Sequence, residues 1–289
     1  MSDEKALIRY RDLQHGLAEL GLDGHSRLIV HAAPQATRPI AGGSESLLGA
    51  LLATSETLLM PTFTPSTAIV PPFGPQDNAL EYGEDDAANL YADIFTPDLP
   101  ADPALGELAE SFRLYPESAR SSHPLLSFCA DEASECLERQ ALDEPLGSIA
   151  WMAEYDADVL LIGLDQRSNV SLHWAERLAG RKTFVRWALT PGGVVTCSNM
   201  PGCAEGFNAI EQRLDGVLRQ VAIGPLALQA VALRDLVNLA VAWIREDPRA
   251  LLCERPACPY CSAVRAAVRQ PEDAPRVGSD GETGLEGNP

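Results

Sequence analysis

Apolar residues along this chain gather in short blocks that alternate with amphipathic stretches. Apolar runs rich in branched side chains predict buried strands at 27–34, 56–64, 120–130 and 156–165. Helical periodicity and helix-start signals predict helices at 4–22, 42–54, 105–116, 148–157, 204–220 and 232–246, and one that opens with NVSLHWAER at 169–177. Strands that alternate with helices indicate an α/β architecture.

Residues 183–200 alternate between apolar and polar positions around the stretch TPGG, which predicts a β-hairpin. Because hairpin strands run antiparallel, we expect a mixed central sheet. A single domain over residues 1–268 accounts for these elements, whereas 269–289 lacks core-forming residues and is expected to be disordered. Residues 65–100, rich in proline, glycine and acidic side chains, predict a long irregular loop.

The chain is strongly acidic, with 41 Asp and Glu residues against 22 Lys and Arg and a formal charge of −19. Such a surface repels nucleic acid and anionic lipid and attracts cations, so an amine substrate would suit it. Acidity that serves solubility alone is an equal alternative. No apolar run approaches the roughly 20 residues of a membrane span, and the charged N-terminal stretch is unlike a signal peptide. We therefore expect a cytoplasmic protein that binds neither nucleic acid nor membrane.

Three histidines fall where an α/β fold places its sites. His31 ends the first strand, His173 follows the most apolar strand, and His123 precedes a proline. Sites in open α/β sheets gather at the carboxyl ends of strands, so we expect these rings to lie near one edge of the sheet. The sequence has no glycine-rich dinucleotide motif after a strand, no P-loop and no nucleophile elbow.

The helix that carries His173 suggests a general base. Asn169 or Ser168 can cap it, which places His173 in the first turn, where the helix dipole keeps the ring neutral. Glu176 lies three residues later on the same face and can support the ring. A neutral histidine beside a carboxylate suits proton abstraction, whereas most pairs at this spacing are solvated helix surface.

Cysteines cluster near the C-terminal end, in the stretch CERPACPYC. Tetrahedral Zn²⁺ wants four thiolate or imidazole ligands, and Cys258 and Cys261 form the usual C-x₂-C pair. Cys253 could be the third ligand and Cys203 the fourth, in a structural site with no open position. A redox role for the CPYC motif is a weaker reading, and unpaired thiols in a reducing compartment remain the plain alternative.

Taken in order, the stretches LIVHAAP, GGSESLLGALL, TLLMPTFT, LGELAESFRLYPESARSSHPLLSFCA, VLLIG and SLHWAE resemble the aminoglycoside 3-N-acetyltransferase family over residues 5–265. RSSHP and LHWAE are the most specific pieces. The resemblance implies a three-layer α/β/α fold and transfer of acetyl from acetyl-coenzyme A to a substrate amine. It also implies that His173 is the general base, that Glu176 supports it, and that some relatives share the grouping of cysteines.

The resemblance further implies that His31-Ala32-Ala33 and the turn with Ser122 and His123 lie beside the coenzyme. The family's serines are replaced by Ala32 and Ala33, so two hydroxyl groups are missing. Independently of the family, backbone N–H groups of Gly42, Gly43 and Ser44 at a helix start could hold a pyrophosphate. A simple helix cap, with Ser44 as the capping residue, explains that stretch equally well.

The substrate regions depart from the family. Relatives that modify aminoglycosides carry acidic residues after the second strand and after the later hairpin, and here both regions lack a carboxylate. Asp77, Glu81 or Asp85 in the long loop could substitute. Three readings therefore stay open: an aminoglycoside or amino-sugar acetyltransferase, an acyltransferase that uses another amine or a larger acyl group, and a non-catalytic binder of coenzyme A or antibiotic.

Overall fold

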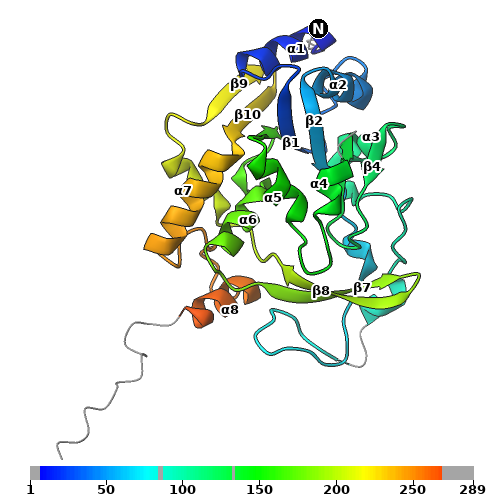
Figure 1. The fold of residues 1–289 in the computed structure, drawn as a ribbon, viewed down its shortest axis with the longest axis vertical. Coiled ribbons are helices and arrows are strands. Elements are labelled where there is room, and N and C mark those ends of the chain that lie inside the picture. Colours follow the sequence, from blue (N-terminus) through cyan, green and yellow to red (C-terminus); the bar gives the residue numbers. More distant parts are fainter. Residues whose placement is uncertain (1–6, 84–86, 132–133, 269–289) are drawn as a thin grey trace, which may run out of the picture.

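The computed structural model describes residues 7–83, 87–131 and 134–268, so the tail 269–289, expected to be disordered, lies outside the described residues. A central sheet of seven strands runs through the molecule (Figure 1). Its order is β4 (Ser118–Arg120), β5 (Phe128–Asp131), β2 (Ser55–Pro61), β1 (Ser26–Ala32), β6 (Asp158–Ile162), β10 (Leu226–Ala232) and β9 (Arg219–Ile223). Strands β2, β1 and β6 are parallel neighbours, and the other neighbouring pairs are antiparallel. The predicted mixed α/β fold is confirmed.

Helices cover both faces of the sheet because the central strands are apolar on both sides. Leu28 and Val30 of β1 belong to one buried cluster and Ile29 belongs to another, as the two-residue period of a strand requires. The first cluster packs under α1 (Tyr10–Glu19), α2 (Gly43–Leu52) and α3 (Gly106–Arg113). The second packs under α4 (Ser134–Glu138), α5 (Gly147–Glu154), α6 (Ser171–Leu178) and α7 (Leu233–Glu246).

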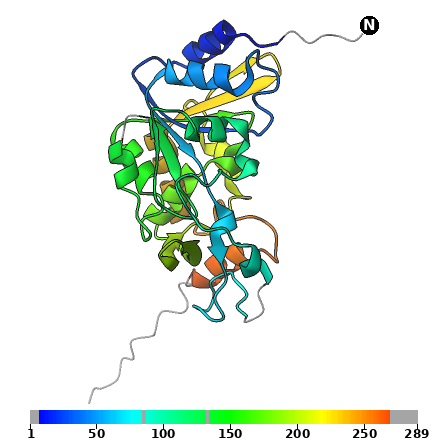
Figure 2. The same ribbon diagram turned by 90° about the vertical axis from the view of Figure 1, so that its right-hand side faces the viewer.

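The predicted hairpin forms, but in a different sheet. Strands β7 (Phe184–Thr190) and β8 (Gly193–Met200) pair antiparallel and join β3 (Ala68–Ile69) in a separate sheet of three strands. The expectation that this hairpin makes the central sheet mixed is therefore wrong. Together with α8 (Pro259–Ala267), the small sheet lies at the opposite end of the molecule from α1 and α2 (Figures 1 and 2).

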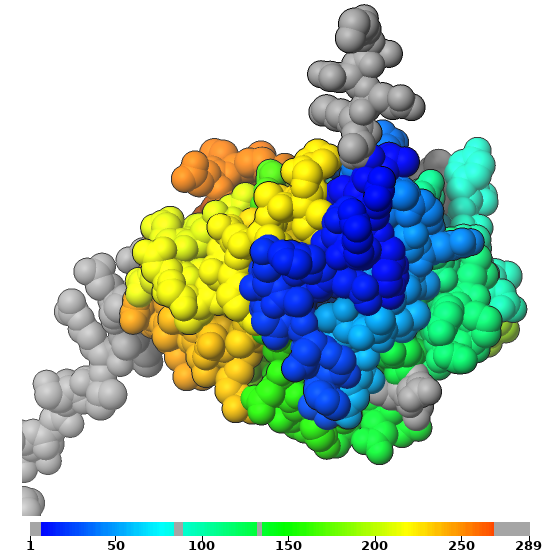
Figure 3. All heavy atoms as spheres, turned by 90° about the horizontal axis from the view of Figure 1, so that it is seen from above, coloured from blue at the N-terminus to red at the C-terminus, as the bar shows by residue number. Residues whose placement is uncertain are grey.

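The central sheet is mixed partly because of a hairpin that the pattern did not predict. The expected helix 204–220 is replaced by a 3₁₀ segment, Phe207–Arg213, and then by β9, whereas the helix expected at 232–246 is confirmed as α7. Gly224 joins β9 to β10 with a φ of +57°, a conformation that favours glycine. Figure 3 shows these strands side by side with α1, where the Ile223 side chain packs against Gly16.

The start of α2 also differs from expectation. Gly42, with a φ of +84°, is the residue that precedes the helix, and Ser44 lies inside the first turn. A Cβ on Gly42 would lie 2.3 Å from Oγ of Ser46, so a side chain has no room there. The Ser44 hydroxyl instead pairs with the hydroxyl of Ser111 at 2.9 Å. The prediction of Ser44 as the capping residue is wrong.

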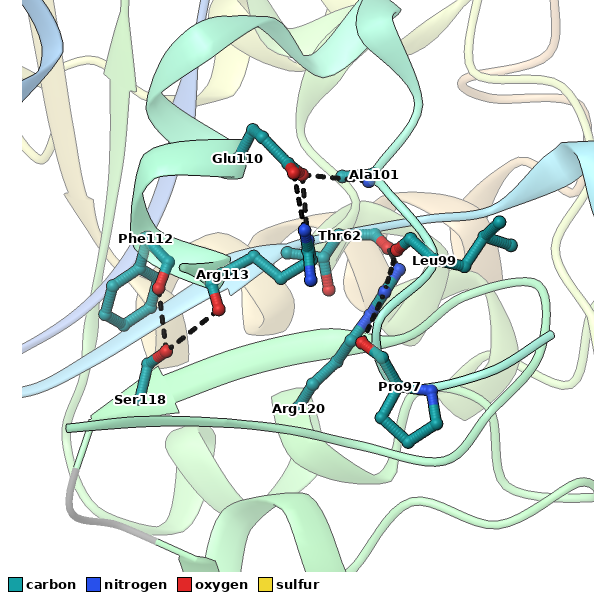
Figure 4. Close-up of polar contacts among 9 residues, drawn as sticks. All are labelled: Thr62, Pro97, Leu99, Ala101, Glu110, Phe112, Arg113, Ser118 and Arg120. Atoms are coloured by element: carbon teal, nitrogen blue, oxygen red, sulfur yellow. Dashed lines mark hydrogen bonds and ion pairs between the residues drawn. The ribbon is translucent and has the colours of Figure 1, made fainter. Parts of the chain in front are cut away.

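The irregular segment 65–100 is fastened where it returns to the sheet (Figure 4). It contains β3 and two short 3₁₀ segments, Pro65–Thr67 and Ala87–Tyr91. The Arg120 guanidinium donates to the carbonyl oxygens of Thr62, Pro97 and Leu99, and so ties the end of this segment to the chain that follows β2. No helix among the residues described has the length and apolar character needed to cross a membrane.

Candidate active site

The carboxyl ends of the parallel strands open onto a mostly apolar cavity of about 240 Å³. Strands β1 and β6 are in register so that Ala32 pairs with Ile162, and both chains leave the sheet at the same edge. The cavity is lined by His31, Ala32, Met60, Phe63, Leu105, Arg167, Ser168 and Val170, among others. Two of the residues expected at the coenzyme, His31 and Ala32, therefore do face a cavity.

His31 is a buried polar group with an unused nitrogen. The residue is 5% exposed, and its Nε2 has no hydrogen-bond partner among the described residues. Burial lowers the pKa of His31 to about 4, because the charged ring would be poorly solvated. The ring is therefore neutral at physiological pH and can donate or accept one hydrogen bond within the cavity.

The first turn of α6 holds His173 at this edge of the sheet. The Asn169 side chain accepts from the backbone N–H of Ser171 at 3.1 Å, which makes Asn169 the side chain that caps the helix start. Val170, which lines the cavity, precedes His173 by three residues, about one helical turn. The expected position of His173 in the first turn agrees with the structure.

His173 and Glu176 form a buried pair rather than solvated helix surface. The Nδ1 of His173 lies 2.7 Å from Oε2 of Glu176, and the two residues are 7% and 9% exposed. Phe207 packs its ring edge against the imidazole, with ring centroids 4.7 Å apart. A carboxylate group without a proton only accepts hydrogen bonds, so the neutral tautomer that suits this contact has the proton on Nδ1 and the lone pair on Nε2.

The Nε2 of His173 has no protein partner in the part of the chain that the structure describes. The fully buried nitrogens without a partner include Nε2 of His31 and Nε2 of His123, but Nε2 of His173 is not one of them. This nitrogen therefore keeps access to solvent, despite the burial of the rest of the ring. The arrangement offers a hydrogen-bond acceptor to a small molecule at the start of α6.

His123 and Ser122 lie outside the lining of the 240 Å³ cavity. His123 is buried, and its Nδ1 accepts from the backbone N–H groups of Leu125 at 3.2 Å and Leu126 at 3.0 Å. Burial lowers the pKa of His123 to about 4, so this ring is neutral too. Its Nε2 lacks a partner among the described residues, whereas Ser122 is exposed.

Gly42, Gly43 and Ser44 do not line that cavity either. A second cavity, of about 910 Å³, lies between the end of β1 and the β9–β10 turn, and its lining includes Ala33, Gln35, Arg38, Gly163 and Pro225. Sequence reasoning missed Arg38 and Gln35. A cation in the short segment between the first strand and the next helix was the available signal, because that segment borders the edge where α/β sites form.

The carboxylates of the long loop lie elsewhere. Asp77 and Glu81 line a third cavity, of about 640 Å³, which α8 closes from the other side with Ser262 and Ala266. Asp85 lies outside the described residues. The structure therefore does not bring Asp77 and Glu81 to the cavity that His31 lines.

The four cysteines predicted to group together do so. Their Sγ atoms all lie within 4.8 Å of one another, although Cys203 is about fifty residues from the nearest of the others in sequence. Cys253, Cys258 and Cys261 are buried and Cys203 is half-buried. In a tetrahedral zinc site, sulfur atoms about 2.3 Å from the metal lie about 3.8 Å apart, so this donor set fits zinc after a small contraction.

Comparisons with known proteins agree with this description. Residues 29–245 match the sequence profile of the family described as Aminoglycoside 3-N-acetyltransferase. Aminoglycoside N(3)-acetyltransferase IX of Micromonospora chalcea is 29% identical over 264 residues, which span 80% of this chain and 92% of that protein.

Two solved structures share the fold. A mutant of aminoglycoside acetyltransferase AAC(3)-IVa, in complex with a gentamicin, superposes with a TM-score of 0.73 at 24% identity and covers 92% of this chain and all of that one. AAC-IIIb, solved as a binary complex with CoASH, gives a TM-score of 0.66 at 23% identity and covers 82% of this chain and 96% of that one.

Fold and site define an α/β enzyme with a histidine–carboxylate pair at the carboxyl edge of its sheet. Because the profile match spans more than half of the chain, the protein belongs to the aminoglycoside 3-N-acetyltransferase family and is an aminoglycoside N(3)-acetyltransferase-like enzyme.

Proposed function

We propose that this protein transfers acetyl from acetyl-coenzyme A to an amine of an aminoglycoside or related amino-sugar, with His173 as general base. The observation that carries the proposal is the buried 2.7 Å contact between His173 Nδ1 and Glu176, which leaves Nε2 with a lone pair. The active unit is a single domain over residues 1–268, acting in the cytoplasm, where cysteines stay reduced.

In this mechanism the free amine of the substrate attacks the carbonyl carbon of the thioester. His173 Nε2 takes a proton from the attacking nitrogen, and Glu176 accepts the hydrogen bond from Nδ1–H and stabilises the cationic ring. The tetrahedral intermediate then collapses, the C–S bond breaks, and the imidazolium returns the proton to the departing thiolate. The products are an amide and free coenzyme A.

The coenzyme is proposed to reach this point along the edge of the sheet. The unpartnered Nε2 of His31 can hydrogen-bond the pantetheine arm in the 240 Å³ cavity, whose apolar wall suits that arm. Ala32 offers only backbone groups, so the coenzyme has fewer side-chain partners than the family pattern supplies. Arg38, exposed beside the larger cavity, is suited to the diphosphate.

Five further residues are proposed to bind the part of the coenzyme that extends past the cavity that His31 lines. Gly42, Gly43 and Ser44 begin α2, a ten-residue helix whose N-terminal N–H groups can bind an anion. Ser122 is exposed, and His123 Nε2 is an unused donor. All five belong to the proposed coenzyme site only if the coenzyme extends past the cavity that His31 lines.

Zinc is proposed at Cys203, Cys253, Cys258 and Cys261. Four thiolates complete a tetrahedral shell, so the metal would have no open position and would take no part in the reaction. It would instead join the chain after β8 to the start of α8, two irregular segments with little core of their own. Elemental analysis of untagged protein prepared without chelator tests this directly.

The choice of acceptor amine is proposed from the charge of the protein and from the lining of the His31 cavity. The net charge of −19 favours a polycationic amine. The residues that line the His31 cavity include no carboxylate, however. The second candidate is therefore an acyltransferase that uses a non-aminoglycoside amine or an acyl group larger than acetyl.

One assay separates the candidates. Purified protein is incubated with acetyl-coenzyme A or a longer acyl-coenzyme A and a panel of aminoglycosides and simpler amines, while free thiol release is followed. Release with an aminoglycoside supports the proposal, and release only with other amines supports the second candidate. Coenzyme binding without any turnover would contradict both and leave a non-catalytic binder.

A further inference from the structure

Arg181 is a buried cation that sits directly behind the His173–Glu176 pair. Its side chain is 3% exposed, and its Nη1 donates to Oε1 of Glu176 at 2.7 Å. The other oxygen of the same carboxylate, Oε2, is the one that contacts His173. Glu176 therefore lies between the imidazole and the guanidinium, with one oxygen committed to each.

The local backbone explains why Arg181 returns to Glu176. Gly180 follows α6 with a φ of +81°, and its N–H donates to the carbonyl of Arg177 at 2.9 Å. The N–H of Arg181 donates to the carbonyl of Glu176 at 3.0 Å. These two bonds form a Schellman cap, a helix ending that turns the chain back over its last turn. The cap places Arg181 beside the residue that its side chain contacts.

The guanidinium is also fixed from the far side. Its Nη2 donates to the backbone carbonyls of Pro248 at 3.0 Å and Ala250 at 2.7 Å, in the segment that follows α7. A planar guanidinium bonded at both ends cannot turn without losing several hydrogen bonds. Two separate parts of the chain, the helix α6 and the segment after α7, therefore fix the orientation of the guanidinium. The guanidinium in turn orients the Glu176 carboxylate.

We propose that Arg181 is a positioning residue for the general base. By orienting the Glu176 carboxylate, it keeps the proton of His173 on Nδ1 and the lone pair on Nε2, where the substrate amine needs it. Without Arg181, a buried carboxylate would keep a single donor and could rotate or take up a proton. The ring could then adopt the other tautomer, with a proton on Nε2, which cannot accept one. The inference rests on the proposed function of His173.

Other ion pairs near this helix are different in kind. Arg177 pairs with Glu144 at a more exposed position, with side-chain exposures of 22% and 44%, and neither of them contacts His173. This pair is only partly buried and is not bonded to the buried carboxylate of Glu176. Arg177→Gln is therefore a matched control: it removes one arginine from the same helix and leaves the buried carboxylate untouched.

The test compares Arg181→Gln, Arg181→Lys and Arg177→Gln with the wild-type chain. Steady-state rates are measured with acetyl-coenzyme A and the panel amine that the wild type acetylates fastest. We expect Arg181→Gln to lower kcat by about 10- to 100-fold, the usual effect of removing the group that orients a functional histidine, with a KM for acetyl-coenzyme A within about 3-fold. Lysine keeps the charge and should recover most of the loss.

A second measurement reports the tautomer and does not depend on turnover. In protein labelled with ¹⁵N-histidine, the His173 resonances, assigned with His173→Ala, show which nitrogen carries the proton. We expect the Nδ1–H form in the wild type and in Arg177→Gln, and a mixture of tautomers in Arg181→Gln. If the Gln variant does not fold, Arg181→Met, which removes the charge but keeps a long apolar side chain, carries the same comparison.

The inference is overturned if Arg181→Gln folds and keeps both its kcat within about 2-fold and the wild-type tautomer. A wild type that acetylates no amine would instead contradict the proposed function, and the tautomer measurement would still decide the role of Arg181.

Discussion

The His173 region and the four-cysteine cluster are assembled in opposite ways. His173, Glu176 and Arg181 come from one helix and its cap, within nine residues, and their contacts are hydrogen bonds already made in the protein alone. The cysteines come from two segments about fifty residues apart, and the contacts between their sulfur atoms are weak ones. A thiol is a weak hydrogen-bonding group, so a cluster of this kind would gain most from the bound zinc ion that we propose.

This difference favours a catalytic role for the His173 region and a structural role for the cysteine cluster. The histidine region has one ring nitrogen without a partner among the described residues, and Val170, one turn before His173, lines the 240 Å³ cavity, although His173 itself does not. A nitrogen of this kind suits a reaction. The cysteine cluster has four ligands and no spare position, which suits a structural metal. The two regions touch the same parts of the chain, since Phe207 follows Cys203 by four residues and Ala250 precedes Cys253 by three. Substitution of a cysteine should therefore lower turnover at His173 only indirectly, by lowering the stability of the fold.

The largest expected effect is on turnover at His173. His173→Ala removes the proton acceptor and should lower kcat by about 10²- to 10⁴-fold, the usual range for general-base assistance. It also leaves Oε2 of Glu176 without this partner, so the free energy of unfolding should fall by about 1 to 3 kcal/mol in a protein that still folds. Thiol release assays and a thermal unfolding scan measure both. Near-normal turnover in a folded variant would contradict the role of His173 as general base, and with it the contrast between a catalytic and a structural region.

The next effect is on stability at the cysteine cluster. Cys258→Ser removes one ligand, so bound zinc should fall below about half an equivalent, and the free energy of unfolding should fall by about 3 kcal/mol or more. For a chain of this size, Tm would drop by about 6 °C or more. Elemental analysis and calorimetry test this. Full zinc content in the variant, or an unchanged Tm after zinc loss, would contradict a structural metal.

A smaller effect concerns the buried neutral histidines. Burial lowers the pKa of His31 and His123 to about 4, whereas an unfolded chain has a histidine pKa of about 6.5. Between these pH values the unfolded state binds more protons, so stability is complete above about pH 6.5 and is lost as the pH falls toward 4. Each ring should cost about 1 to 1.5 kcal/mol at pH 5.5 relative to pH 8.

His123→Asn isolates one of these rings. The Asn oxygen can replace Nδ1 as the acceptor for the N–H groups of Leu125 and Leu126 but does not titrate in this range. Denaturant unfolding at pH 8 and pH 5.5 should show a smaller pH difference in the variant, by about 1 kcal/mol. An identical pH difference in both proteins would show that His123 is not buried as a neutral ring.

The smallest effect is expected at Ser44. Because the helix start is formed by Gly42, Ser44→Ala loses only a hydroxyl contact to Ser111 and should change the free energy of unfolding by about 1 kcal/mol or less. Its KM for acetyl-coenzyme A should also stay within about 2-fold, since the proposed anion contacts are backbone N–H groups. A larger rise in KM would mean that the Ser44 hydroxyl itself contacts the coenzyme.

The regions also differ in how far the sequence predicted them. The His173–Glu176 contact follows from a three-residue spacing in a helix, and the cysteine grouping follows from a C-x₂-C pair and two nearby thiols. Arg181 was missed because it lies beyond the motif, and its other partners, Pro248 and Ala250, are 67 and 69 residues away. Only the packed chain shows that contact.

The fold was predictable from the sequence where a single hydrophobic period, that of a strand or that of a helix, dominated a segment. Strands β1 and β6 and helix α7 have clear apolar patterns, whereas β9 is largely solvent-facing and is joined to the more buried β10 by a tight turn at Gly224. The place of β9 at the edge of the sheet is supported by contacts with α1 and the residue after it, about 200 residues earlier in the chain. The separate small sheet was missed because its third strand, β3, has only two residues.

Chemical rescue tests the central claim, that the Nε2 of His173 accepts the proton from the amine. His173→Gly leaves a space where free imidazole can bind, and acetyl transfer is measured as a function of added imidazole. The account predicts a rate that is very low without imidazole and rises with its concentration, while the wild-type rate stays flat. A glycine variant that turns over at the wild-type rate without imidazole would contradict the claim.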